Sequence, residues 1–248
     1  MAATVRLVFL GCGDAFGSGG RLNTCFHVAA PSARFLIDCG ASSLVALHRA
    51  GLTTDDVDAI LISHFHGDHY GGLPVLLLEA AKHRQRQRPL TIVTPAGGEQ
   101  RTRDLMEVMY PGSSGVVDEL DVRFVPYAAH QPLELEGFSV TAFPVIHSDA
   151  ALSHGLRISV NDRVIGFSGD TCWTDELIGI ADGADLMICE CNFFDTVTPI
   201  HVDYRTLARH LPELKAGRII LNHLGEEMLT HLERVELECA YDGMAVEL

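Results

Sequence analysis

The amino-acid sequence predicts an α/β fold in which two β-sheets pack face to face, with helices on their outer sides. Short runs of β-branched and aromatic residues recur at close intervals in both halves of the chain. Segments with helical periodicity lie between these runs, and no linker, repeat or low-complexity tract divides the chain. The 248 residues, 47% of them hydrophobic, can bury a substantial core. We therefore expect a single domain spanning residues 1–248.

The first half of the chain is predicted to form short strands with two helices between them. The segment LPVLLLEAAKHRQR at 73–86 has helical spacing and a basic last turn. The segment GGEQRTRDLMEVMY at 97–110 is predicted to form the second helix. Strands are predicted at 4–10, 24–30, 34–38, 58–63 and 89–94, and most of them end in glycine or in a loop.

From residue 121 onward the pattern changes to strands that look antiparallel, as in a meander. Likely turn dipeptides, Glu136-Gly137 and Asn161-Asp162, separate some of them. In the last quarter, ADLMICE (184–190) and GRIILNH (217–223) are predicted as buried strands around the helical segment DYRTLARHLPEL (203–214). The strands of the meander are predicted at 121–127, 132–136, 138–146, 155–161 and 163–170.

The charge balance favours a small substrate. The chain has 18 basic and 33 acidic residues, a formal charge of -15, so most of its surface would repel a long polyanion such as duplex nucleic acid. Long nucleic acid is therefore not the expected partner.

The cysteines and the N-terminus predict a cytoplasmic protein. Seven cysteines are an odd number, and none forms the C-x-x-C pair of a structural zinc site, so we expect reduced thiols. The N-terminal stretch lacks the basic and apolar regions of a signal peptide. No stretch approaches the roughly 20 apolar residues of a membrane span.

The segment ISHFHGDHYGG at 62–72 places three histidines and an aspartate within six positions. Imidazoles and carboxylates are the usual ligands of zinc and its neighbours, so the cluster predicts a metal site. His64 and His66 can point to the same side of an extended loop, whereas the adjacent Asp68 and His69 must diverge and would serve a second ion. A loop of solvated histidines and a single structural metal are the alternatives.

Three later polar residues also follow predicted strands: His147, Asp170 and His223. Taken singly, each would be interpreted as a surface or capping residue. Ligands on loops that leave rigid strands can nevertheless converge on one edge of a sandwich. Together with the cluster at 64–69, and in this order, they are predicted to bind metal.

The pattern H-x-H-x-D-H, formed here by His64, His66, Asp68 and His69, resembles the mark of the metallo-β-lactamase superfamily. The resemblance extends through FLIDCG (35–40), PVIHS, FSGDT and LNHLG. It implies a four-layer αββα sandwich with two divalent metal ions at one edge of the paired sheets. Zinc is expected, with manganese and iron as alternatives. The first ion would take His64, His66 and His147, the second Asp68, His69 and His223, with Asp170 bridging.

A hydroxide held between two such ions is a nucleophile at neutral pH, and the ions can neutralise charge on a phosphoryl or acyl oxygen. Two divalent cations, two carboxylates and one hydroxide leave a net charge of about +1, which favours an anionic substrate. In flavo-diiron members of the superfamily, glutamate occupies the position of His66, so dioxygen or nitric oxide reduction is disfavoured. Asp68 is expected both to bind metal and to steer the attacking water.

Within the superfamily, the chain most resembles ribonuclease Z and its small phosphodiesterase relatives. The matching segments are GDAFGSGGRLNT (13–24), IHVDYRTLARHL (200–211) and AYDGMAVEL at the C-terminus. The resemblance implies that His201 acts near the scissile phosphate, by donating a proton to the leaving oxygen or by stabilising charge. Without the resemblance, His201 would be interpreted as the start of a helix. Relatives of this kind form dimers, so a homodimer is also expected.

Ribonuclease Z inserts a long arm for transfer RNA between its histidine and aspartate ligands. Here only 23 positions separate His147 from Asp170, and two predicted strands occupy nearly all of them. We therefore expect a small or cyclic phosphodiester as the substrate. A thioester or lactone hydrolase and a transfer-RNA 3′-processing endonuclease are the alternative functions, and a catalytically silent metal sensor is a third.

Several other residues have weaker predictions. Asp38 is expected either to orient a ligand histidine or to organise a turn. Cys189 and Cys191 share one face of a strand and are expected to be buried small hydrophobes, with Glu190 on the opposite face. His154 is a candidate for the pocket wall. The basic run KHRQRQR at 82–88 is interpreted as a solvated helix end.

Overall fold

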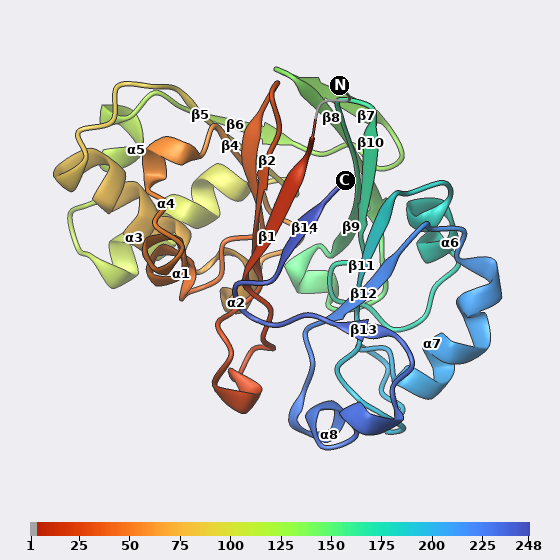
Figure 1. Cartoon of the computed structure of the whole chain (residues 1–248). Helices are drawn as coiled ribbons and strands as arrows, with labels where there is room; N and C mark the ends of the chain where they lie inside the picture. The colour runs from red at the N-terminus through yellow and green to blue at the C-terminus, as the bar shows by residue number, and fades with distance from the viewer. Residues whose placement is uncertain (1–3) are drawn as a thin grey trace.

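Two seven-stranded β-sheets stack in the centre of the structure, and helices cover their outer faces (Figure 1). This computed structural model describes residues 4–248. The first sheet contains, in spatial order, β14 (Ala245–Glu247), β1 (Arg6–Gly11), β2 (Cys25–Ala29), β3 (Arg34–Ile37), β4 (Ala59–Leu61), β5 (Leu90–Thr94) and β6 (Val122–Pro126). The second contains β13 (Glu238–Cys239), β12 (Ile219–Asn222), β11 (Leu186–Glu190), β10 (Arg163–Phe167), β9 (His154–Val160), β8 (Phe138–Pro144) and β7 (Pro132–Leu135).

Each sheet is antiparallel on one side and parallel on the other. In the first sheet the pairs from β14 to β3 are antiparallel, and the pairs from β3 to β6 are parallel. In the second sheet the pairs from β7 to β10 are antiparallel, and the pairs from β10 to β13 are parallel. Both sheets are therefore mixed, as the predicted α/β class requires.

The helices lie in two groups, one on each outer face (Figure 1). Residues of α1, α3, α4 and α5 pack against the outer face of the first sheet. Residues of α6, α7 and α8 pack against the outer face of the second sheet. The helices are α1 (Ser43–Arg49), α2 (Gly67–Tyr70), α3 (Leu73–Leu78), α4 (Gly98–Met109), α5 (Val116–Glu119), α6 (Glu176–Ala181), α7 (Tyr204–His210) and α8 (Glu226–Leu229). The expected four-layer arrangement is confirmed.

Alternation along the strands explains the layers. In β1, Leu7 and Phe9 face the second sheet, and Val8 and Leu10 face the helices. Successive side chains of a strand point to opposite faces, so a strand that is apolar on both faces is buried between two layers. The largest buried side chains include Phe9, Phe26 and Phe167, whose rings meet edge to face between the sheets.

Three sequence-based expectations need correction. The sequence predicts that the strand at 121–127 belongs to the antiparallel meander, but β6 pairs in parallel with β5 in the first sheet. The helix expected over 73–86 ends as α3 and a π-helical turn at Glu79–His83. The basic run that follows is not simply a solvated helix end. Arg86 is only 7% exposed and donates to the carbonyl oxygens of Thr54, Val57 and Pro89.

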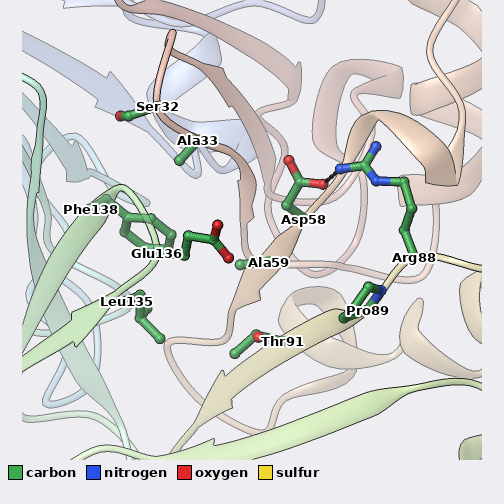
Figure 2. Close-up of a pocket in the computed structure, with 10 residues that line it drawn as sticks. All are labelled: Ser32, Ala33, Asp58, Ala59, Arg88, Pro89, Thr91, Leu135, Glu136 and Phe138. Carbon is green, nitrogen blue, oxygen red and sulfur yellow. Dashed lines mark hydrogen bonds and ion pairs between the residues drawn. The ribbon is translucent and has the colours of Figure 1, made fainter.

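The two ends of the parallel strands differ in character. A hollow of about 310 Å³ lies at the start of β3, β4 and β5. Among its lining residues, Asp58 pairs with Arg88 (Figure 2). The other end of β4 leads to His64 and the predicted ligands that follow it, and the other end of β3 leads to Asp38. The hollow and the predicted metal site therefore lie at opposite ends of the strands. Among residues 4–248, no helix combines the length and the hydropathy that crossing a membrane requires.

Candidate metal centre

The seven residues predicted to bind metal meet at one edge of the stacked sheets. His64 to His69 follow β4 in the first sheet. His147, Asp170 and His223 follow β8, β10 and β12 of the second sheet. Loops at strand ends can carry polar side chains while the strands hold them in place. The seven side chains lie close together, and their binding of metal stays a prediction.

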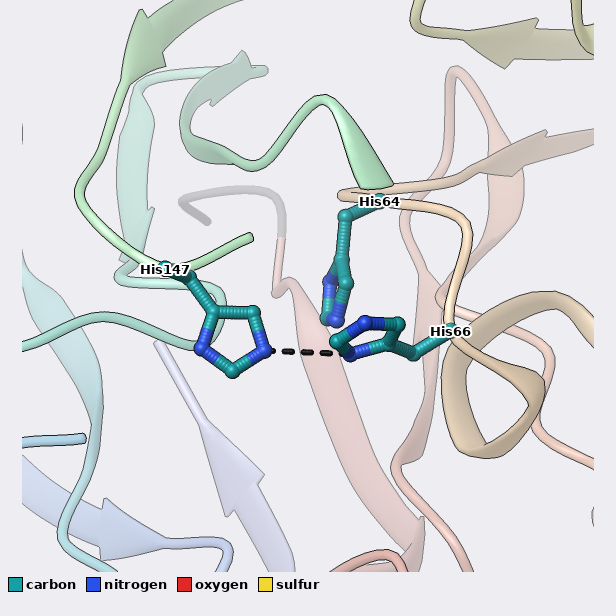
Figure 3. A group of neighbouring side chains, drawn as sticks. All are labelled: His64, His66 and His147. Atoms are coloured by element: carbon teal, nitrogen blue, oxygen red, sulfur yellow. Dashed lines mark hydrogen bonds between the residues drawn. The ribbon is translucent and has the colours of Figure 1, made fainter. Parts of the chain in front are cut away.

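A first group consists of His64, His66 and His147, whose rings point toward one another (Figure 3). One ring nitrogen from each lies within 4.8 Å of the others. His147 Nε2 and His66 Nδ1 are 3.0 Å apart. This spacing lets three imidazoles share one cation, as in three-histidine zinc sites.

A second group consists of Asp68, His69, Asp170 and His223, with one ligand atom from each within the same 4.8 Å limit. Asp68 Oδ2 lies 3.2 Å from the Nε2 atoms of both His69 and His223. Asp170 Oδ2 lies 3.3 Å from the same two nitrogens. Two carboxylates and two imidazoles therefore surround a second common point.

Asp170 stands between the two groups. Its Oδ2 atom is also 3.9 Å from the Nε2 atoms of His64 and His147. One carboxylate oxygen thus faces ring nitrogens of both groups. That is the position a ligand bridging two cations must occupy.

Buried polar atoms and displaced pKa values test whether these side chains suit a cation. His64 Nε2 is buried and has no hydrogen-bond partner among the described residues. Burial and the neighbouring His69 hold the pKa of His64 well below its usual value, so its imidazole stays neutral, as a metal ligand must. Burial lowers the pKa of His223, but Asp170 and Asp68 outweigh it and raise it to about 9. The carboxylates thus create a demand for positive charge, and the donor set fits divalent metal ions.

The loop that carries Asp68 and His69 is compact because glycines allow close approach. A Cβ atom on Gly40 would lie 2.1 Å from the carbonyl oxygen of Asp68. Cys39 N also donates to the carbonyl oxygen of His69 over 2.7 Å. The turn after β3 therefore packs directly against the short helix α2, which presents both ligands.

Asp38 is placed to orient His69, which is one of the two roles predicted for it. Its Oδ2 atom lies 2.7 Å from His69 Nδ1, which leaves Nε2 for a cation. The same carboxylate accepts hydrogen bonds from Ser63 N and Ser63 Oγ. Ser63 Oγ lies 3.0 Å from His64 Nδ1, so Asp38 is linked to both histidines. Asp38 has a left-handed backbone with φ 59°, which few residues other than glycine, asparagine and aspartate adopt readily.

Asp38→Ala should lower metal affinity about 10- to 100-fold, because His69 loses the acceptor that fixes its ring. Asp38→Asn is the matched control. It keeps an oxygen acceptor and tolerates the left-handed backbone, so its loss should be smaller. Competition with a chromogenic chelator measures both affinities. Equal metal affinity in wild type and Asp38→Ala would show that Asp38 has no orienting role.

His201 lies beside both groups. Its ring centroid is 4.8 Å from that of His147 and 5.5 Å from that of His223. His201 Nδ1 lies 2.9 Å from Glu190 Oε1. Glu190 is fully buried on β11, and the backbone N–H of Thr171 donates to the same Oε1 atom. Burial lowers the pKa of His201, but Glu190 and Asp170 together raise it above the ordinary value.

The weaker predictions have mixed outcomes. Cys189 and Cys191 are buried in the core under α6 and α7, as expected. Glu190 faces the opposite side of the same strand and contacts His201. His154 does not line the metal cavity; its Nδ1 atom lies 2.7 Å from the carbonyl oxygen of Leu152, outside the cavity wall. That expectation is wrong because β9 begins at this residue and directs its ring toward Tyr127.

Sequence reasoning missed three contributors to the site. Asn192 Nδ2 lies 3.2 Å from His223 Nδ1. The carbonyl oxygen of Ile200 lies 2.7 Å from His147 Nδ1 and accepts its hydrogen bond. Phe16 lines the same cavity of about 340 Å³ as five of the seven predicted ligands and His201. Asn192 could have been found in the sequence, because it follows a buried strand as the predicted ligands do. A contact from a backbone carbonyl has no signature in the sequence.

Known proteins share sequence and fold with this chain. The model of the family described as Anti-Pycsar protein Apyc1 matches residues 5–238. The Anti-Pycsar protein Apyc1 of Bacillus phage 010DV004 is 29% identical over 244 residues, which cover 92% of each chain. Ribonuclease Z of Methanothermobacter thermautotrophicus is 25% identical over 284 residues, covering 94% of this chain and 89% of its own.

A solved structure shows the same fold. The crystal structure of the metallo-beta-lactamase fold protein YhfI from Bacillus subtilis aligns with a TM-score of 0.80 at 22% identity. The alignment covers 99% of this chain and 100% of that one. The resemblance to the metallo-β-lactamase superfamily, near ribonuclease Z, is therefore confirmed.

Proposed function

Because the chain belongs to the Anti-Pycsar protein Apyc1 family, within the metallo-β-lactamase-fold hydrolases, we propose that it is a binuclear metal-dependent phosphodiesterase. Its substrate is a small or cyclic phosphodiester. The seven side chains of the two groups hold two divalent cations, with zinc expected ahead of manganese or iron. Elemental analysis of the purified protein tests both the number and the identity of the ions.

The observation that carries the phosphodiesterase assignment is the position of His201. It lies against the two metal groups, yet its Nδ1 atom is engaged with Glu190 rather than aimed at either group. This leaves Nε2 for a substrate atom. Because Glu190 and Asp170 favour the charged imidazolium, His201 can donate a proton to an alkoxide leaving group. Protonation of the leaving oxygen is the step that separates phosphodiester cleavage from hydrolysis of an activated thioester.

Divalent cations bound at such a centre supply an activated water and neutralise charge on the phosphoryl oxygens. Asp68 and Asp170 balance part of the cation charge and leave the site attractive to a monoanionic diester. Asp68 is partly open to the cavity, where it can accept a hydrogen bond from the attacking water. His201 acts on the departing oxygen. The chain thus provides one group that acts on the attacking water, Asp68, and another that acts on the leaving oxygen, His201.

The dimensions of the site support a small substrate. The interval from His147 to Asp170 contains a short 3₁₀ helix, β9 and β10, which leaves no residues for a protruding arm. The cavity volume of about 340 Å³ falls in the range typical of small-molecule sites. A net charge of -15 also weakens the attraction to a long polyanion.

A substrate panel tests the proposal. Purified, metal-loaded protein would be assayed with cyclic nucleotides, cyclic sugar phosphates, bis(p-nitrophenyl) phosphate and short RNA ends, under zinc and under manganese. Acyl thioesters, lactones and a precursor transfer RNA complete the panel. Hydrolysis of thioesters or lactones, with no diester cleaved, would favour the alternative hydrolase. Cleavage of the precursor transfer RNA would favour the endonuclease. Inactivity on all compounds at full metal occupancy would favour the silent sensor.

The homodimer stays a prediction, which light scattering would test.

Glu190→Gln is expected to move the alkaline limb of the kcat profile to lower pH. A general acid works only while protonated, so the rate falls as pH rises through the pKa of His201. Glu190 raises that pKa, and the neutral glutamine removes its charge while keeping an oxygen for Thr171 and His201. The measurement is kcat against pH with an alkyl diester, at matched metal content. An alkaline limb that does not move would exclude His201 as the acid.

A further inference from the structure

An exposed aromatic side chain stands at the mouth of the metal cavity. Phe16 is 94% exposed, the largest exposed fraction among the large hydrophobic side chains that the structure describes. It lines the cavity together with Asp68, His147, Asp170, His201 and His223. Exposing a phenyl ring to water costs about 2 kcal/mol of burial free energy. Aromatic side chains that line a cavity beside a few polar groups are typical of small-molecule sites, so Phe16 is a candidate for contact with a bound ligand.

The segment that carries Phe16 is held in place by its own hydrogen bonds. The Asp14 carboxylate is buried and accepts from Ser18 N over 2.8 Å and from Ser18 Oγ over 2.7 Å. Gly13 N donates to the carbonyl oxygen of Leu22 over 2.7 Å. Gly17 has a left-handed backbone with φ 67°, which turns the chain directly after Phe16. The ring is therefore presented from a closed, defined loop.

A second apolar surface lines the cavity from the other loop. Ile200 is 41% exposed, and Phe193 is partly exposed beside it in the cavity wall. Both residues contact side chains that are predicted to act in the site. The Ile200 carbonyl accepts a hydrogen bond from His147, and the Phe193 ring centroid lies 6.3 Å from that of His201. This second surface consequently borders the residue that acts on the leaving oxygen.

The charged groups of the cavity thus have apolar borders on two loops. The phosphate of a diester belongs at the cations, so its organic substituents must contact these borders. The loop of Phe16 adjoins Asp68, since Ala15 and Asp68 together line the neighbouring hollow as well. Phe16 is therefore on the Asp68 side of the cavity, whereas Phe193 and Ile200 are on the His201 side. A leaving substituent near His201 would then lie against Phe193 and Ile200, and a substituent that remains on phosphorus would lie against Phe16.

We propose that Phe16 is a specificity-determining residue that stacks on a flat, apolar substituent of the substrate, the one that stays on phosphorus after cleavage. The inference rests on the proposed phosphodiesterase function and narrows it to diesters with a planar ring on that side. Aromatic pairs prefer stacked or edge-to-face contact, and such contact adds to the burial of apolar area.

Two synthetic diesters with the same leaving group test the inference: phenyl p-nitrophenyl phosphate and methyl p-nitrophenyl phosphate. Wild-type protein is expected to show the lower KM with the phenyl compound. Phe16→Ala should raise that KM about tenfold, leave kcat within about twofold and leave the methyl compound unaffected. Phe16→Trp should retain the preference, and Phe16→Leu should lose most of it, because leucine is apolar but not flat.

Tyr241→Ala is the matched control, since Tyr241 is 59% exposed and does not line the cavity. Metal content and melting temperature of Phe16→Ala should equal those of wild type. If wild type cleaves both diesters and Phe16→Ala changes neither KM, or changes both equally, the role of Phe16 is wrong and the phosphodiesterase function stands. If metal-loaded wild type cleaves neither diester nor any other in the panel, the function and the inference are both wrong.

Discussion

Asp170→Ala is expected to lose bound metal and hydrolysis together, with kcat/KM lower by at least about a thousandfold. One oxygen of Asp170 faces ring nitrogens of both groups, at 3.3 Å in one and 3.9 Å in the other. Its removal deletes a ligand from both cation positions. It also leaves only one carboxylate, Asp68, to offset the charge of two divalent ions.

The measurement is elemental analysis after dialysis, followed by diester hydrolysis on the same samples. Asp182→Ala is a suitable control, because Asp182 is an exposed aspartate outside the cavity. Asp170→Asn tests charge separately from shape, since it keeps one oxygen in place. Equal melting temperatures of wild type and Asp170→Ala, both measured in chelator, would exclude a folding defect in the variant. Retention of two ions and normal turnover by Asp170→Ala would contradict the bridging role.

His201→Ala is expected to keep both ions and to lose mainly the rate. Removing a general acid lowers kcat by about 10²- to 10⁴-fold when the leaving group needs a proton. The loss should be largest for an alkyl leaving group. It should be smallest for p-nitrophenolate, which leaves readily without a proton. The dependence on the leaving group separates proton donation from simple charge stabilisation at the phosphate.

Metal content of the variant and kcat across a leaving-group series are the two measurements. His83→Ala provides the control, because His83 is exposed and does not line the cavity. A uniform loss of rate across the series would assign His201 to charge stabilisation instead of proton transfer. Loss of one ion would make His201 a metal ligand, and an unchanged rate would remove the main support for the phosphodiesterase assignment.

The strand-like runs and helical segments indicated two stacked sheets with helices outside, and the family resemblance implied the four-layer arrangement. Leu7 and Phe9 alternate with Val8 and Leu10 because β1 is buried on both faces, and this pattern is visible in the letters alone. The pairing of β6 was mispredicted for a physical reason. β6 is the edge strand of its sheet and is only partly buried, so its side chains resemble those of an antiparallel strand. The direction of its pairing depends on the crossover through α4 and α5.

The candidate site was predictable where the chemistry resides in side chains. His64, Asp170 and His223 could be identified because each follows a strand and the family pattern sets their order. Their role as ligands stays a prediction, which the dialysis experiment tests. The contact from the Ile200 carbonyl to His147 could not be predicted, since any residue provides a carbonyl. The exposure of Phe16 was equally hidden, because a phenylalanine in a glycine-rich segment gives no sign of its direction.

The two ligand groups draw on loops from both sheets, with His64 and His66 from the first and His147 from the second. Cations bound there would cross-link the two sheets, because their ligands come together only when the sheets are stacked. By mass action, each occupied position shifts the folding equilibrium toward the native state. Metal starvation would then reduce the abundance of the protein as well as its activity, because the metal-free chain unfolds and is degraded more often.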